Sequence, residues 1–278
     1  MELNEFILEA LKEDIGDGDH STLACIPPDE NGKAILKIKE NGILAGVEIA
    51  AAIFKKLDPE CELNILINDG TQVKYGEIAF EVKAKVHTIL KAERLVLNIM
   101  QRMSGIATLT RRYTEKIENY PAKILDTRKT TPNFRWFEKK AVLIGGGHNH
   151  RMGLYDMIML KDNHIDYCGS IENAIDKTNQ YLKDKNLNLQ IEIEARTIDD
   201  VNRIMNHGGV HRIMLDNFTP EDLKTAVDLI GKKFETEASG GITLETITSY
   251  AISNVDFISV GAIIHHAVSM DLSLKAVK

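Results

Sequence analysis

Apolar and polar residues follow two different rhythms in the two halves of this chain. Near the start, apolar residues recur at helical spacing from Leu3 to Leu11 and predict an amphipathic helix that ends before Gly16. Stretches of alternating polarity then predict short half-exposed strands, with a helix between them at 46–57. This mixture is typical of a small domain with an open-faced sheet. The predicted strands lie at 33–40, 61–69 and 77–87.

A long helical pattern between 88 and 119 predicts one long helix or two joined helices. Its apolar residues fall on one stripe, and Gly105 is the expected kink or junction. We therefore place a domain boundary near this point, between an N-terminal α/β sandwich domain at 1–107 and a catalytic domain at 108–278. The last ~12 residues are expected to pack back on the first domain.

The second half consists of short apolar runs, and the last four start about 22 residues apart. The gaps between these four hold helices with readable caps, because Thr197 precedes Asp200 and Thr219 precedes Asp222 by three residues, and Thr243 opens the last helix. The predicted strands lie at 123–127, 157–161, 189–195, 211–217, 233–239 and 256–261.

Repeated strand–helix units of this length need right-handed crossovers and a parallel sheet. Six or seven such units close most economically into an α/β barrel, and we expect that fold for the second domain. A doubly wound open sheet is the alternative that the pattern leaves open.

Composition narrows the possible partners of this 278-residue chain. Aromatic residues make up only 6%, with one Trp, and the formal net charge is −7. Both values argue against nucleic acid and anionic membranes as partners. Three widely spaced cysteines, Cys25, Cys61 and Cys168, form no disulfide or zinc pattern and indicate a reducing compartment. Because no signal peptide or membrane span is visible, we expect a cytoplasmic protein.

Functional side chains are expected at the carboxyl ends of the barrel strands. Glu192 and Glu194 are two residues apart in one predicted strand and therefore share a face. Since Ile191 and Ile193 belong under the surrounding helices, the two glutamates should point into the lumen, where a carboxylate needs a cation, a metal or hydrogen bonds. The pattern favours a functional role for Glu194, nearer the carboxyl end, and a structural ion pair for Glu192.

Several cations converge on the same end of the predicted barrel. They leave the first strand, follow the 145–147 glycine run, or end the next strand. Like charges gather in an acidic protein only when an anion offsets their repulsion, so we expect a small, multiply anionic ligand. The residues concerned are Arg128, Lys129, His150, Arg151 and Lys161.

Glycine-rich turns follow the last two predicted strands, at 239–241 and 260–262. Barrel enzymes often bind phosphate at this position through main-chain N–H groups. Carboxylates beside phosphates favour Mg²⁺, whereas the histidine spacings match no zinc motif. From the residues alone, the chain is predicted to be a barrel enzyme that acts on a phosphorylated, multiply anionic small molecule, with Mg²⁺.

These residues resemble the quinolinate phosphoribosyltransferase family, also called carboxylating nicotinate-nucleotide pyrophosphorylase. The resemblance covers nearly the whole chain, through ordered motifs that include EDIGDGDHST, AERLVLNIMQRMSGIAT, DTRKTTP, GGGHNHRMGLYDMIMLKDNH, IEIEA, IMLDN, EASGG and ISVGAIIH. It implies an open-faced sandwich plus a seven-stranded incomplete TIM-like barrel. It also implies a pentosyltransferase that joins phosphoribosyl pyrophosphate to quinolinate with decarboxylation, giving nicotinate mononucleotide in NAD biosynthesis. The family is at least dimeric, with an active site shared between subunits.

The resemblance also implies individual roles. Arg128, Lys129, His150, Arg151 and Lys161 are expected to bind the two quinolinate carboxylates, with Arg94 contributed by the neighbouring subunit and Arg102 a weaker candidate. Glu194 and Asp216 are expected to hold Mg²⁺, directly or indirectly, and the ribose hydroxyls. Lys129, Glu194 and Asp216 are the expected catalytic residues. Ser239, Gly240, Gly261 and His265 are expected to contact the 5′-phosphate.

The resemblance is incomplete at one point, because Ile264 and His266 stand where the family often has hydroxyl residues. Three other functions remain open. A Schiff-base lyase would use Lys129 or Lys161, and borohydride trapping would detect it. A non-carboxylating relative would release no carbon dioxide. A non-enzymatic anion-binding protein would not need Glu194 and Asp216 beside a phosphate.

Overall fold

A computed structural model describes residues 2–277 and divides them into two compact units. The sheet unit extends through Arg111 and also includes Thr131–Gly146 and the segment from His266 onward. The barrel unit comprises Arg112–Thr130 and Gly147–His265. Among the described residues, no helix is both long and apolar enough to span a membrane.

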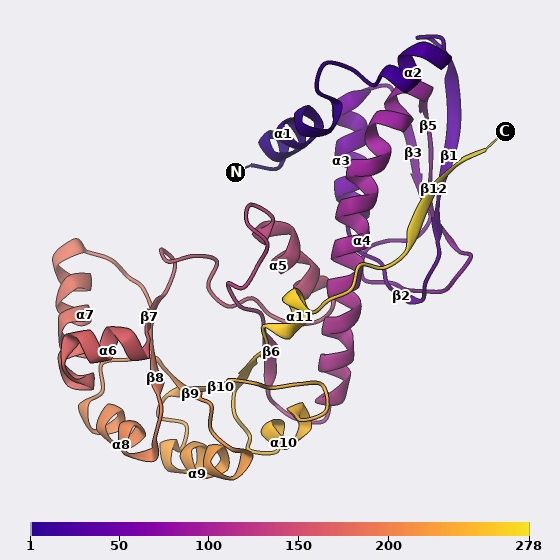
Figure 1. Cartoon of the computed structure of the whole chain (residues 1–278). Helices are drawn as coiled ribbons and strands as arrows, with labels where there is room; N and C mark the ends of the chain where they lie inside the picture. Colours follow the sequence, from indigo (N-terminus) through magenta and orange to yellow (C-terminus); the bar gives the residue numbers. More distant parts are fainter. Residues whose placement is uncertain (1, 278) are drawn as a thin grey trace. The chain divides into compact units, whose positions relative to one another are not determined.

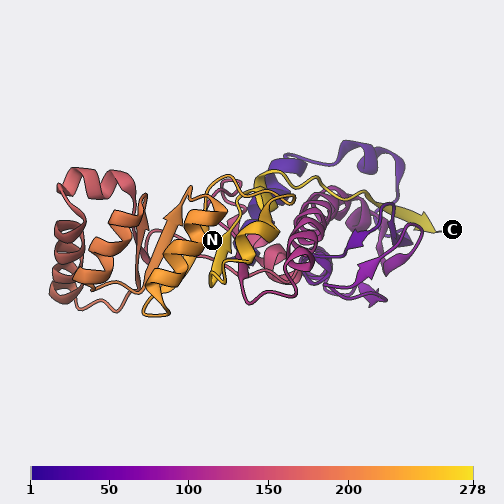
Figure 2. The ribbon, with the colours of Figure 1, turned by 90° about the horizontal axis from the view of Figure 1, so that it is seen from below.

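The sheet unit is built on a four-stranded antiparallel sheet with the order β12-β1-β5-β3 (Figure 1). The C-terminal strand β12 pairs along β1, and Figure 2 shows it in yellow beside the violet strands. A short ribbon of β2 and β4 accompanies this sheet. The bounds are β1 Asn31–Ile38, β2 Gly42–Ile43, β3 Glu62–Ile65, β4 Gln72–Val73, β5 Ile78–Lys85 and β12 Leu272–Val277.

Burial alternates along the sheet of this unit, as the polarity pattern predicts. In β1 the side chains of Ala34, Leu36 and Ile38 are buried, whereas the residues between them are partly exposed. The buried face carries Phe80, which packs edge-on against Phe54 of a helix. The sheet is therefore open on its other face. The helices of this unit are α1 Leu3–Ile15, α2 His20–Cys25, α3 Val47–Leu57, α4 Val86–Lys116 and α5 Arg135–Ile144.

The long helix α4 runs unbroken through Gly105, so the expected kink or junction is wrong. The glycine instead allows the main chain at Val268 to pack closely against the helix. A Cβ atom at this position would lie 2.0 Å from the carbonyl oxygen of Val268, so only glycine lets this stretch of main chain approach the helix.

The barrel unit holds a six-stranded parallel sheet with the order β6-β11-β10-β9-β8-β7. The first of these strands, β6, pairs with the last, β11, as in a barrel, and the sheet curves round on itself (Figure 1). The strands otherwise follow chain order, so the doubly wound alternative is excluded. The bounds are β6 Lys123–Leu125, β7 Ile158–Leu160, β8 Ile191–Ala195, β9 Arg212–Asp216, β10 Glu235–Ser239 and β11 Phe257–Ser259.

The barrel is incomplete between β6 and β7. The segment after the glycine run bridges to β6 through the single pair Leu125–His148, and His148 N–H donates to Ile124 O at 2.8 Å. The sheet thus has six strands and one bridged residue where the resemblance implies seven strands. The segment leaves the strand geometry after His148, because the next main-chain N–H groups no longer follow the ladder and the His150 N–H bonds the Asp126 carboxylate at 2.9 Å.

Helices cover the outer side of this curved sheet (Figures 1 and 2). The caps predicted at Thr197 and Thr219 are confirmed, since each threonine hydroxyl accepts an N–H three residues later at 3.1 Å. The last predicted cap is wrong: α10 begins at Ile247, after a turn in which Thr243 O accepts two N–H groups. The helices are α6 Asp162–Cys168, α7 Ile171–Lys185, α8 Ile198–His207, α9 Pro220–Ile230, α10 Ile247–Ala251 and α11 Ala262–His265.

Candidate active site

A carboxylate and an ammonium group meet at the carboxyl ends of β7 and β8. Glu194, in β8, is buried except for 6% of its surface, and its Oε1 pairs with the Nζ of Lys161, the residue after β7. Its Oε2 accepts the main-chain N–H of Asp162 at 2.9 Å. Both oxygens of Glu194 are therefore held in place by groups of the neighbouring strand and its loop.

A second carboxylate, Asp216, ends β9 and lies close to the first. Burial and the charge of Glu194 raise the pKa of Asp216, while a hydrogen bond from Ser239 and the charge of Lys161 oppose the rise. The side chain of Asn217 donates to Asp216 Oδ2 at 2.7 Å. The four side chains Lys161, Glu194, Asp216 and Ser239 thus come together from four successive strands, as the barrel interpretation predicts.

The turn after β10 is shaped by glycine. Gly240 has a φ of +103°, and a Cβ atom there would lie 2.1 Å from the side-chain oxygen of Asn217. Asn217 itself has a φ of 58° and donates its main-chain N–H to Ser239 O at 2.8 Å. Asparagine tolerates this left-handed conformation better than most residues. The end of β9 and the turn after β10 are therefore locked together beside Asp216.

The predicted cations after β6 lie beside the last glycine turn and the 148–151 segment. A Cβ atom on Gly261 would contact Lys129 Cδ at 3.2 Å and His265 Nε2 at 3.0 Å, so these side chains lie over that glycine. Burial and the nearby charge of Arg128 lower the pKa of Arg151, and the charge of Glu194 acts in the opposite direction. Arg128 and Arg151 are therefore close enough for their charges to interact.

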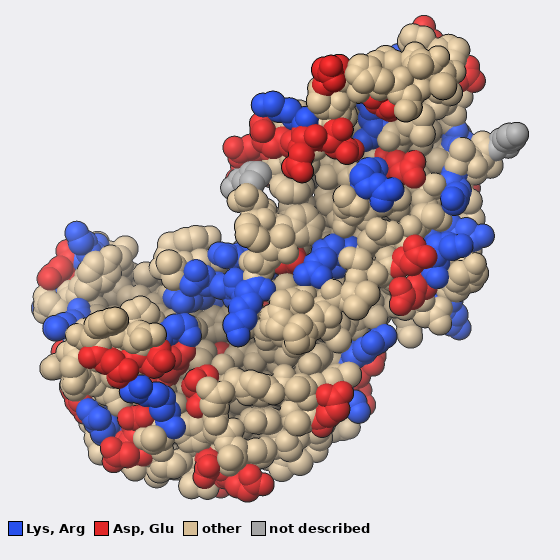
Figure 3. Space-filling model, viewed as in Figure 1, with Lys and Arg blue, Asp and Glu red and all other residues tan. Residues whose placement is uncertain are grey.

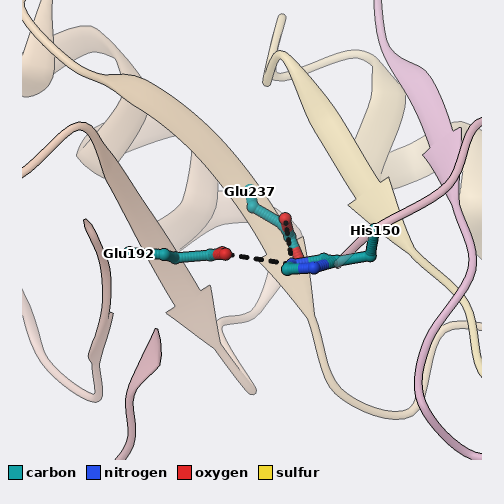
Figure 4. Close-up of side chains that lie close together, drawn as sticks. All are labelled: His150, Glu192 and Glu237. Atoms are coloured by element: carbon teal, nitrogen blue, oxygen red, sulfur yellow. Dashed lines mark ion pairs between the residues drawn. The ribbon is translucent and has the colours of Figure 1, made fainter. Parts of the chain in front are cut away.

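The remaining predicted cation, His150, is buried and faces the lumen (Figure 4). Its Nε2 lies 2.9 Å from Glu192 Oε2 and 3.3 Å from Glu237 Oε2. Its Nδ1 accepts the main-chain N–H of Arg151 at 2.7 Å. Burial alone would lower the pKa of His150, but hydrogen bonds to the two glutamates and their charge raise it to about 9. The prediction that Glu192 forms a lumenal ion pair is confirmed.

Arg212 completes this buried layer from the start of β9. Its Nη1 lies 3.0 Å from Glu237 Oε2, and its Nη2 lies 3.0 Å from Glu235 Oε2. The guanidinium also stacks on the Phe257 ring, with 4.0 Å between its carbon and the ring centroid. Sequence reasoning missed Glu237 and Arg212. The sequence did contain a signal for Glu237. Glu235 and Glu237 lie two residues apart in the 233–239 run and so repeat the spacing of Glu192 and Glu194.

Two carboxylate sets could hold a metal ion. Among the described residues, ligand atoms of His150, Glu192 and Glu237 lie within 4.8 Å of one another in the lumen. The second set is Glu194 and Asp216, whose mutual repulsion contributes to the raised pKa of Asp216. Oxygen ligands of this second kind suit Mg²⁺, especially beside a phosphate.

The two arginines predicted from the long helix belong to the sheet unit. Arg94 is exposed on α4. Arg102 is held by a two-pronged hydrogen bond to Glu138 Oε1, at 3.0 and 2.8 Å, and donates to Ala267 O at 2.7 Å. Because Glu138 is fully buried, this pair is part of the structure of the sheet unit.

Figure 3 shows Lys and Arg side chains gathered on the face of the barrel unit that carries the loops around β6 and β7.

Two family profiles match the chain along almost its whole length. The profile of the quinolinate phosphoribosyl transferase N-terminal domain matches residues 19–104, and that of the C-terminal domain matches residues 106–275. Quinolinate phosphoribosyltransferase [decarboxylating] 1b of Nicotiana tabacum is 45% identical over 99% of this chain and 82% of its own length. A probable nicotinate-nucleotide pyrophosphorylase [carboxylating] of Synechocystis sp. is 39% identical over 99% of this chain and 93% of its own length.

Solved structures agree with these relatives. The crystal structure of NadC from Streptococcus pyogenes superimposes with a TM-score of 0.93 at 36% identity, covering 99% of this chain and 97% of that one. The nicotinate-nucleotide pyrophosphorylase from Francisella tularensis gives a TM-score of 0.92 at 37% identity, covering 99% and 96%. The ordered motifs, the incomplete barrel and these similarities agree, and the chain belongs to the quinolinate phosphoribosyltransferase family.

Proposed function

We propose that this chain transfers the phosphoribosyl group of phosphoribosyl pyrophosphate to quinolinate, with decarboxylation, giving nicotinate mononucleotide, carbon dioxide and pyrophosphate. This is the reaction named for its relatives in NAD biosynthesis. The observation that carries the proposal is the pairing of the Lys161 ammonium group with Glu194 at the mouth of the barrel unit, where the charges of both residues also act on Asp216. The charges of Arg128 and Glu194 both act on Arg151, which supports a cationic site at the same mouth. A doubly charged pyridine and a sugar phosphate need these two kinds of group side by side.

The cations are proposed to bind the two carboxylates of quinolinate. Arg128 and Arg151 offer planar forks that match a carboxylate, and Lys161 offers a point charge that Glu194 already orients. Lys129, over Gly261, stands next to this group. The family resemblance also assigns His150 to the quinolinate carboxylates. The residue is only 8% exposed, and its Nδ1 already accepts the Arg151 N–H. Its contribution is developed in the next subsection.

The other half of the site is proposed to bind phosphoribosyl pyrophosphate. Glu194 and Asp216 are placed for the ribose hydroxyls and for Mg²⁺, held directly or through water. The charge of Glu194 helps to raise the pKa of Asp216, and a divalent cation would relieve this repulsion. When bound, Mg²⁺ offsets the charge of the departing pyrophosphate. Ser239, Gly240, Gly261 and His265 are proposed to contact the 5′-phosphate, since main-chain N–H groups can approach an anion closely at glycine turns.

The chemistry then follows from what these side chains hold in place. As pyrophosphate leaves the ribose C1, the ring becomes oxocarbenium-like, and the carboxylates of Glu194 and Asp216 stabilise its positive charge. The pyridine nitrogen of quinolinate, fixed by its two bound carboxylates, attacks C1. The alkylated nitrogen is cationic and accepts the electron pair released when the adjacent carboxylate leaves as carbon dioxide. Lys129 is placed to protonate the resulting carbanion.

A second subunit is proposed to complete the site. Arg94 is exposed on α4, so its guanidinium is available to another copy of the chain. Equal mixing of the inactive variants Arg94→Ala and Arg128→Ala tests this. Random reassociation into dimers would place both substitutions in one of the two sites of each hybrid and restore about a quarter of the wild-type sites. No recovery after confirmed subunit exchange would contradict a shared site.

We place the enzyme in the cytoplasm. Cys25, Cys61 and Cys168 are all free thiols, which suits a reducing compartment. Some plant relatives are named as chloroplastic or mitochondrial, so the compartment differs within the family. Fractionation of the source cells tests the compartment of this chain. Recovery of the protein in an organelle fraction would contradict the proposal.

Purified protein incubated with quinolinate, phosphoribosyl pyrophosphate and Mg²⁺ tests the reaction itself. We expect nicotinate mononucleotide by chromatography, and equal amounts of carbon dioxide and pyrophosphate. EDTA should stop the reaction and added Mg²⁺ should restore it. Pyrophosphate release without quinolinate, product without carbon dioxide, or a borohydride-trapped adduct would each contradict the proposed reaction.

A further inference from the structure

His150 has protein partners on both ring nitrogens. Its Nδ1 accepts the Arg151 N–H at 2.7 Å, and its Nε2 lies between the carboxylates of Glu192 and Glu237 (Figure 4). The His150 residue is 8% exposed, and both glutamates are fully buried. The imidazole therefore links the main chain at Arg151 to the charged interior of the barrel.

The Nε2 of His150 carries a proton whatever the charge of the ring. Because Nδ1 accepts an N–H, the neutral ring must hold its own proton on Nε2. The imidazolium form also has a proton on Nε2. Buried carboxylates need a donor, and this Nε2 lies 2.9 Å from an oxygen of Glu192 and 3.3 Å from an oxygen of Glu237. The Nε2 contact is therefore common to both charge states. The Nδ1 contact with the Arg151 N–H belongs to the neutral ring, and it opposes the rise in the pKa of His150 that the two glutamates cause.

A metal ion held by the same three side chains is the competing interpretation. Their ligand atoms lie within 4.8 Å of one another, which one ion could span. A metal would need the Nε2 lone pair, which the proton occupies. Arg212 also lies 3.0 Å from Glu237 and already offsets one carboxylate charge. The geometry favours a proton at this place over a metal.

The main chain at 150–151 depends on this arrangement. The Asp126 carboxylate accepts the His150 N–H at 2.9 Å, and the His150 ring accepts the next N–H along the chain. The guanidinium of Arg151 donates to Met157 O at 3.2 Å. If the ring rotated, the Arg151 N–H would lose its acceptor, and the path of the chain into the Arg151 side chain would no longer be held.

We propose that Glu192 and Glu237 are positioning residues for the quinolinate site, which hold the Nε2–H of His150 so that its Nδ1 fixes Arg151. They act through His150 and need not touch the substrate. This inference rests on the proposed function, because it assigns Arg151 to a substrate carboxylate. It goes beyond that function by giving the buried layer of the barrel a role in substrate binding.

Neutral, nearly isosteric substitutions test the proposal. Glu192→Gln and Glu237→Gln keep the volume of each side chain and remove one charged acceptor from His150. Glu235→Gln is the matched control, because Glu235 lies in the same strand as Glu237 and also pairs with Arg212, but is exposed. We expect the KM for quinolinate to rise about tenfold in the first two variants, with the KM for phosphoribosyl pyrophosphate unchanged. The control should stay within about twofold of wild type.

A purely structural role would give a different result. Variants that unfold at lower temperature while keeping both KM values and kcat would overturn the proposal. If a variant fails to fold, the wild-type protein still provides a test through ¹⁵N-labelled histidine and NMR. We expect an Nε2–H signal that disappears in His150→Gln, with Nδ1 appearing as an acceptor. A His150 ring protonated on Nδ1 at the pH of the assay, alone or together with Nε2, would overturn the proposal.

Metal analysis of the purified wild-type protein separates the two interpretations of the cluster. We expect no stoichiometric transition metal, and one equivalent per chain that is lost in Glu237→Gln would overturn the proposal. The NMR and metal measurements need no turnover. If the wild-type protein failed to make nicotinate mononucleotide, the proposed function would be wrong, but NMR could still measure which nitrogen of His150 is protonated.

Discussion

Glu192 and Glu194 lie two residues apart in β8 and face the same side, yet their surroundings differ. Glu192 is fully buried with His150 and Glu237, and burial together with the Glu237 charge raises its pKa. Glu194 stands one step nearer the mouth, where Lys161 and the Asp162 N–H hold both of its oxygens. Under the proposed function, depth in the barrel decides whether the same side chain supports the site or takes part in it.

A third level lies at the opposite ends of the strands. Just before β11, the Asp256 carboxylate accepts the Thr236 N–H at 2.9 Å and lies 2.7 Å from Lys232 Nζ. In barrels this end supports stability, whereas the carboxyl ends carry chemistry. Substitutions at the mouth should therefore reduce activity at nearly constant stability, and substitutions at the opposite end should do the reverse.

The largest effect is expected for Glu194→Gln. The variant keeps a hydrogen-bonding side chain but removes the charge that faces Lys161, Asp216 and the positive ribose. We expect kcat to fall by roughly 100- to 1000-fold, as for other groups that stabilise developing charge. Steady-state formation of nicotinate mononucleotide measures this. Asp166→Asn, an exposed carboxylate paired with Arg196, is the control and should retain activity. Near wild-type turnover in Glu194→Gln would remove Glu194 from the site.

Arg128→Ala should come next, with roughly a 100-fold loss of kcat/KM. Removing one guanidinium from a charge-assisted pair with a substrate carboxylate typically has a cost of this size. The KM for quinolinate should rise, whereas phosphoribosyl pyrophosphate should still bind in a calorimetric titration. Arg112→Ala, an exposed arginine on α4, serves as the control. Equal weakening of both substrates would contradict a specific role for Arg128 at quinolinate.

Asn217 allows side-chain and main-chain effects to be separated. Asn217→Gly keeps the left-handed backbone and removes the hydrogen bond to Asp216, while Asn217→Ala also strains the backbone. We expect both variants to raise the KM for phosphoribosyl pyrophosphate several-fold. Only the alanine variant should lose about 1–2 kcal/mol in a urea titration. If the two variants had the same stability, the left-handed conformation would not be what Asn217 supplies.

The smallest effect on activity is expected for Asp256→Asn, which should keep its kcat. Burial raises the pKa of Asp256, but bonds from Lys232 and Thr236 outweigh it and lower the pKa overall. A lowered pKa stabilises the folded state above the unfolded pKa, and this stabilisation is lost as pH falls through the folded value. The wild type should therefore exceed the variant by about 1 kcal/mol at pH 7. This difference should shrink below about pH 4, and a constant difference would contradict the explanation.

The secondary structure could be predicted from the sequence wherever a local rule applied. Short apolar runs located the barrel strands, and threonine followed by an acid located two helix starts. Gly105 misled the prediction, because a glycine in a helix can reflect either a break or a close approach of another segment. The contact with Val268 is 163 residues away in sequence, and no local pattern contains it.

For the site, the sequence by itself determined that Glu192 and Glu194 share one face of a barrel strand and that Lys161 and Asp216 stand at strand ends, because alternate residues of a strand must share a face and parallel strands of a barrel must end together. It also determined the family, through ordered motifs. Only the tertiary structure decided the partners: that His150 turns inward to Glu192 and Glu237, that Arg212 joins them, and that Asn217 holds Asp216. Such pairings depend on side-chain distances across neighbouring strands, and a polarity pattern carries no information about them.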